Sequence, residues 1–103
     1  MLPREAFGRW VHAHEEDSAE ARVYRPDGYP LPRSRGRSGF ELREDGTFVG
    51  YPIAATDGNA EVTGRWRLVQ PGQLQVTFAH GEAPPLTLRL LDIAPDRLRL
   101  RPE

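Results

Sequence analysis

Apolar and polar residues alternate in short runs along most of this chain, and the clearest run is 39–51, GFELREDGTFVGY. The Asp-Gly pair in its middle predicts a β-hairpin, because glycine adopts the positive φ of a tight turn without steric cost. A three-residue turn with Gly46 in the left-handed conformation would pair Arg43 with Thr47. We favour this register over a two-residue turn because it gathers three apolar side chains on one face, those of Phe40, Leu42 and Phe48.

The same alternation recurs in other segments that are separated by turn residues. These segments are 7–16, 21–25, 60–69, 73–80, 86–93 and 97–101. About eight short strands with no helical period predict an all-β antiparallel fold. Every turn after Gly39 is short, so strands adjacent in sequence should be neighbours in space. We therefore expect a small up-and-down β-barrel that forms a single domain over 1–103.

Composition narrows the functional classes. The chain has 103 residues, 38% of them hydrophobic and 28% charged, which is typical of one folded domain. The net charge of -1 gives no general attraction to nucleic acid or anionic membranes. The absence of cysteine excludes disulfide and thiolate chemistry. No apolar run near the N-terminus is long enough for a signal peptide or a membrane span, so we expect a cytoplasmic protein with neither a membrane nor a nucleic-acid partner.

The long connection 26–38 is rich in proline, glycine and arginine. A long irregular loop in so small a domain is often functional. Arg35 and Arg37 could clamp a carboxylate or phosphate at the mouth of the barrel. Alternatively, the loop arginines pair with the acidic residues 15–17 and Glu20.

The histidines form the most specific candidate for chemistry. His12 and His14 lie two residues apart on a predicted strand, so they should share the face of Trp10, and His80 should also point inward. With Glu16, they have the ligand types of a zinc or other divalent metal site, and no other cofactor is expected. Two alternatives are that the histidines only hydrogen-bond at the open end, or that they serve as general acids and bases.

An eight-stranded barrel is either filled by its own side chains or wide enough for one small ligand. Polar contacts to such a ligand would come from His12, His14, Tyr24, Arg35 and Arg37. The apolar wall would be formed by Phe40, Leu42, Phe48, Leu74, Val76 and Phe78.

The outward positions of one strand suggest a contact between subunits. Val49, Tyr51 and Ile53 would form an exposed apolar stripe, with Leu91 and Ile93 as further candidates. Such a stripe suggests a homodimer. The alternative is that the loop 26–38 covers it.

Several short motifs together resemble the small bacterial lipocalin-like (calycin-type) β-barrels. They are Gly8-Arg9-Trp10, the 40–48 hairpin, Gly64-Arg65-Trp66 and the closing leucine-rich strands. The resemblance implies that Trp10 packs at a closed end, often beneath an arginine of the last strand. That arginine would be Arg97, Arg99 or Arg101. The chain departs from the family in its short strands and in lacking a C-terminal helix signal.

These observations leave three functional hypotheses. The first is a protein that binds a partly apolar, anionic small molecule in or at the mouth of the barrel. The second is an enzyme of the isomerase or cyclase type that uses His12 and His14 as acid, base or metal ligands. The third is a filled barrel that acts as a protein-interaction module.

Overall fold

The computed structural model describes residues 2–33, 37–51, 61–78 and 84–102. Short 3-10 helices, η1 (Arg4–Ala6) and η2 (His14–Glu16), flank the first strand. The eight strands are β1 (Gly8–His12), β2 (Arg22–Pro26), β3 (Gly39–Leu42), β4 (Thr47–Tyr51), β5 (Val62–Gln70), β6 (Gln73–Phe78), β7 (Leu86–Ala94) and β8 (Arg97–Leu100). Within this part of the chain, no helix is both long and apolar enough to cross a membrane.

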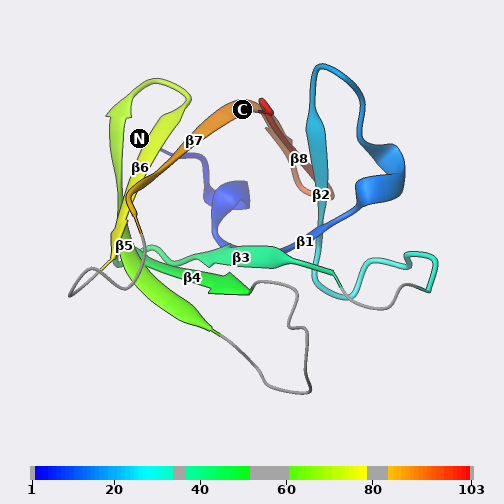
Figure 1. Cartoon of the computed structure of the whole chain (residues 1–103), viewed down its shortest axis with the longest axis horizontal. Helices are drawn as coiled ribbons and strands as arrows, with labels where there is room; N and C mark the ends of the chain where they lie inside the picture. Colours follow the sequence, from blue (N-terminus) through cyan, green and yellow to red (C-terminus); the bar gives the residue numbers. More distant parts are fainter. Residues whose placement is uncertain (1, 34–36, 52–60, 79–83, 103) are drawn as a thin grey trace.

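The strands close into an antiparallel barrel in the order β1-β2-β8-β7-β6-β5-β4-β3, with β3 pairing back to β1 (Figure 1). The predicted all-β, up-and-down barrel of eight strands is confirmed. From β3 to β8 every strand pairs with the next one in sequence, as the short turns predict. The exception lies at the long connection 27–38. This connection leads from β2 to β3, and β1 lies between those two strands.

The hairpin of β3 and β4 has the predicted register. The backbone N–H of Arg43 donates to the carbonyl of Thr47 at 2.9 Å, and Gly46 occupies the turn with φ of 95°. The carboxylate of Asp45 accepts a further hydrogen bond from the N–H of Thr47 at 2.9 Å, which stabilises the turn. The expected apolar face points into the core, where Phe40, Leu42 and Phe48 are at most 4% exposed.

The N-terminal segment covers one end of the barrel. Leu2 and Ala6 belong to the core cluster, and the indole N–H of Trp10 donates to the carbonyl of Ala6 at 3.0 Å. Trp10 is 2% exposed, so the expectation that it packs at a closed end is confirmed. Two of the three arginines that could lie over Trp10 are found elsewhere. Arg99 pairs with Asp92 and Arg101 borders the opposite end of the barrel.

Candidate functional site

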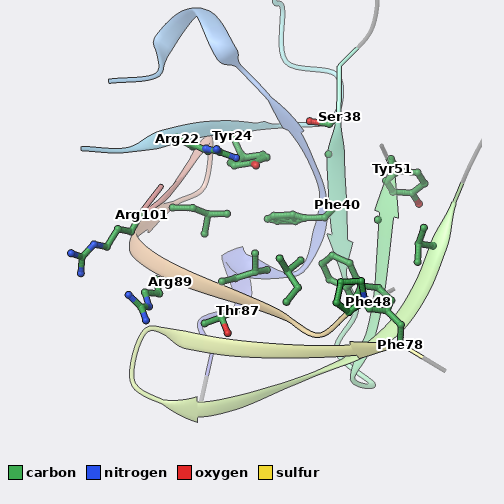
Figure 2. Close-up of a pocket in the computed structure, with 17 residues that line it drawn as sticks. Arg22, Tyr24, Ser38, Phe40, Phe48, Tyr51, Phe78, Thr87, Arg89 and Arg101 are labelled. Carbon is green, nitrogen blue, oxygen red and sulfur yellow. The ribbon is translucent and has the colours of Figure 1, made fainter. Parts of the chain in front are cut away.

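A cavity of about 480 Å³ lies at the end of the barrel opposite the N-terminal segment (Figure 2). Four aromatic rings form a continuous wall along it. Ring centroids are 5.0 Å apart for Tyr24 and Phe40, 6.0 Å for Phe40 and Phe48, and 5.9 Å for Phe48 and Phe78. Alternation along β2, β3, β4 and β6 brings these four side chains together, because each occupies an inward position of its strand.

The remaining lining is mostly aliphatic, with a few neutral polar groups. Val62, Leu86, Leu88 and Leu100 supply the aliphatic part, and Ser38, Tyr51 and Thr87 supply the polar groups. Among the described residues, the lining contains no carboxylate and no histidine. The cavity therefore offers an apolar surface without negative charge.

Three arginines on adjacent strands border this cavity. Arg22 of β2 lies opposite Leu100 of β8, and the N–H of Arg101 donates to the carbonyl of Arg89 in β7 at 2.8 Å. All three side chains are exposed, and in the described part of the chain none of them takes part in a salt bridge. Positive charge thus accumulates along one side of an apolar cavity. Arg101 was predicted only as an arginine that could lie over Trp10, and no local sequence pattern indicated that Arg22 and Arg89 would join it at a cavity.

Tyr24 connects the aromatic wall to the first strand. Its ring stacks on the imidazole of His12 at 5.0 Å, and burial raises the pKa of its phenol, while the nearby charge of Arg22 opposes that rise. His12 is fixed in turn by Asp17, whose Oδ2 lies 2.8 Å from Nε2. The other carboxylate oxygen of Asp17 accepts the N–H of Val23 at 2.9 Å. His12 therefore supports the cavity wall from behind and does not line the cavity.

The predicted histidine pair does not share a strand face. Strand β1 ends at His12, because Ala13 leaves the extended conformation with ψ of 73°, and His14 belongs to η2. The two imidazole centroids are 6.2 Å apart. Both carboxylate oxygens of Glu16 bind Arg25, at 2.9 and 2.5 Å.

A metal site built on these histidines finds no geometric support in the described residues. They contain no group of three or more histidine, aspartate or glutamate side chains that could hold a metal ion. The third candidate, His80, lies outside the described residues. The metal site therefore remains a prediction from the sequence.

The arginine clamp predicted for the loop is wrong for Arg37. Its guanidinium donates to both carboxylate oxygens of Glu15, at 2.8 and 2.5 Å, and to the carbonyls of His12 and Pro32. These hydrogen bonds lower the pKa of Glu15 to about 2. Arg37 therefore follows the alternative expectation, in which the loop pairs with the acidic segment. Arg35 lies outside the described residues.

The predicted apolar wall divides into two parts. Tyr24, Phe40, Phe48 and Phe78 border the cavity. Leu42, Leu74 and Val76 are fully buried and do not border it. These three residues belong to the hydrophobic core cluster.

The exposed stripe predicted for β4 is wrong. Val49 is only 3% exposed, and Tyr51 is half-buried, with the Arg9 guanidinium 4.2 Å above its ring centroid. The Tyr51 hydroxyl also donates to Glu41 at 2.9 Å. Ile53 lies outside the described residues. This strand therefore provides no apolar surface for a homodimer.

Comparison of the chain with known protein families, with curated proteins and with solved structures finds no match.

Proposed function

We propose that this barrel binds a small, partly apolar, anionic molecule in the cavity at its open end. One observation carries the proposal. An aromatic-walled cavity of about 480 Å³ lies beside Arg22, Arg89 and Arg101, and in the described part of the chain these arginines form no salt bridge. Small-molecule sites in proteins typically measure roughly 300–1,000 Å³ and combine apolar walls with a few polar groups.

The two kinds of lining residue suit the two parts of such a ligand. Contact with the aromatic wall removes apolar ligand surface from water, which is worth roughly 25 cal/mol per Å². Guanidinium groups present planar donors that match carboxylate, sulfonate or phosphate oxygens. The described lining has no carboxylate that would repel an anion.

Binding is better supported than acid–base catalysis. In the described lining, the titratable groups are the phenols of Tyr24 and Tyr51 and the three arginines. The pKa values of both phenols are raised, first by burial, so the phenols are protonated at neutral pH. His12 is held by Asp17 behind the wall. A filled barrel acting only as an interaction module is not favoured, because it would not contain this cavity.

The closed eight-stranded antiparallel barrel is compatible with a lipocalin-like fold. We include membership of that family in the proposal, on the basis of the barrel and its covered end. The position of β1 between β2 and β3 is the main departure from a simple meander.

The proposal can be tested with two fluorescent probes that differ by one anionic group. N-phenylnaphthylamine is neutral, and anilinonaphthalene sulfonate adds a sulfonate to the same aromatic framework. We expect both probes to bind saturably at one site. Val62→Phe should weaken both by about tenfold or more, because the larger ring occupies a position that lines the cavity.

Val69→Phe is the matched control. It makes the same change in the same strand, but Val69 is 40% exposed and lies outside this cavity. Circular dichroism would show that both variants keep the fold. If neither probe binds the wild type saturably, or if Val62→Phe binds both probes as the wild type does, the proposed function is wrong.

A further inference from the structure

Strand β7 has backbone partners on both sides only around Arg89 and Leu90. Its first half, from Leu86 to Arg89, pairs with β6, and its second half pairs with β8. Strand β8 ends at Leu100, opposite Leu90, and the last hydrogen bond between the two segments runs from the N–H of Arg101 to the carbonyl of Arg89. Among the described strands, none pairs with residues 86–88 on the β8 side. The wall of the barrel is therefore interrupted between these residues and the end of β8.

Prolines flank the interruption on both sides. Pro84 and Pro85 precede β7, and Pro102 follows Arg101. Proline has no backbone N–H, so it cannot donate to a neighbouring strand. Because proline is rare inside a sheet, these residues mark the limits of the regular pairing.

The cavity reaches this interruption. Leu88 is buried and faces inward, so its neighbours Thr87 and Arg89 occupy outward positions of β7, yet both border the cavity. Leu100 and Arg101 border it from the other side. The cavity therefore extends to the edge of β7 that no described strand pairs, and it does not stop behind the inner face of β7.

The charged groups at this edge lie outside the aromatic wall. Figure 2 shows that the side chains of Arg89 and Arg101 extend from β7 and from the end of β8 on the side away from Phe40 and Phe48. An anion enclosed against the phenylalanines would be distant from these guanidinium groups. An anion placed in the interruption would lie between them.

We infer that the interruption is a side opening for the ligand. This inference rests on the proposed function and specifies the ligand class. The ligand is an amphipathic anion with its charge at one end. Its apolar part lies against the aromatic wall, and its anionic group leaves the barrel between Arg89 and Arg101. A compact ion with charge on all sides would not contact both the aromatic wall and the arginines at the opening.

The first test removes the charge at the opening. The double variant Arg89→Gln/Arg101→Gln should weaken anilinonaphthalene sulfonate by about tenfold and leave N-phenylnaphthylamine unchanged, because only the former carries the anion. Arg67→Gln/Arg97→Gln is the control. It removes the same net charge from exposed arginines that do not border the cavity, and it should leave the affinities for both probes unchanged.

The second test locates the anionic probe. The chain has no cysteine, so Thr87→Cys introduces a single thiol at the opening. Saturating anilinonaphthalene sulfonate should slow alkylation of this thiol several-fold. Thr77→Cys, at an exposed position of β6 outside the cavity, should react at the same rate with and without the probe.

The outcomes separate the two proposals. Two results would overturn the side opening and leave the binding cavity intact, provided that the wild type binds N-phenylnaphthylamine. One is that the arginine double variant binds both probes as the wild type does. The other is that the anionic probe does not protect Thr87→Cys from alkylation. If neither probe binds the wild type, the proposed function itself is wrong.

Discussion

The arginines of this barrel differ in their environments. Arg25 and Arg37 each bind both oxygens of one carboxylate, on Glu16 and Glu15, and so attach η2 and its neighbouring loop to the barrel. The arginines beside the cavity form no salt bridge in the described part of the chain. Since all 14 basic residues of the sequence are arginine, residue type alone could not separate the two groups. The difference depends on which carboxylates the fold brings within reach.

The pair formed by Glu15 and Arg37 predicts a pH dependence of stability. Hydrogen bonds from Arg37 lower the pKa of Glu15 from its ordinary value of 4.5 to about 2. This carboxyl group therefore stabilises the folded state above pH 4.5, and the stabilisation is lost as the pH falls toward 2. Glu15→Gln should lower the Tm modestly at neutral pH, because solvent screens an exposed pair, and should have no effect on the Tm near pH 2.

Thermal unfolding followed by circular dichroism across this pH range measures the difference between wild type and variant. Glu44→Gln, in the exposed hairpin turn, serves as the control and should show no such trend. A Tm deficit for Glu15→Gln that is equally large at both ends of the range would contradict the role assigned to the pair.

At the level of single elements, local sequence rules succeed where a turn fixes the pairing. The hairpin of β3 and β4 follows its predicted register because Gly46 supplies the positive φ and the apolar positions select one face. The predicted strand 7–16 was too long. Its alternation continues through Ala13, but Ala13 is buried and its N–H donates to the carbonyl of Val23. That contact depends on β2, so the alternation of one segment could not reveal it.

The turn at Gly46 should be sensitive to substitution. The residue has φ of 95°, and its carbonyl also accepts the backbone N–H of Trp66 at 2.9 Å, which fixes the turn against β5. Gly46→Ala should lower the free energy of unfolding by about 1–2 kcal/mol, because a Cβ atom is disfavoured in the left-handed region. Urea unfolding would measure this loss. Gly46→Asn is the matched variant and should lose less, since asparagine tolerates this region better. Equal stability of the alanine variant and wild type would refute this account.

For the whole molecule, the sequence predicts the barrel and most of its core but not the arrangement of its two ends. The alternation that buries Phe40 also buries Leu42, yet only Phe40 borders the cavity. Leu42 lies directly opposite Phe48, which does border the cavity, so the difference depends on the side chains that neighbouring strands place around each position. The position of β1 between β2 and β3 was likewise beyond prediction, because the connection 27–38 contains no strand pattern that would indicate its path.

The covered end and the open end should have separable roles. Leu2 is buried in the core cluster at the covered end, whereas Leu91 is 47% exposed on β7. Leu2→Ala should lower the free energy of unfolding by about 2 kcal/mol, the lower part of the range for buried leucine, because a segment near the terminus can partly relax into the space. Leu91→Ala makes the same chemical change at an exposed position and should cost less than about 0.5 kcal/mol.

The same leucine variants also test whether the two ends act independently. The cavity is not lined by Leu2 or by any other residue of the N-terminal segment. The affinity of Leu2→Ala for N-phenylnaphthylamine should therefore equal that of the wild type at temperatures where the variant is folded. Urea unfolding and probe titration on one preparation provide both numbers. A Leu2→Ala variant that is as stable as the wild type would show that the N-terminal segment does not secure the covered end. A stable fold with weakened probe binding would show that the two ends are coupled through the core.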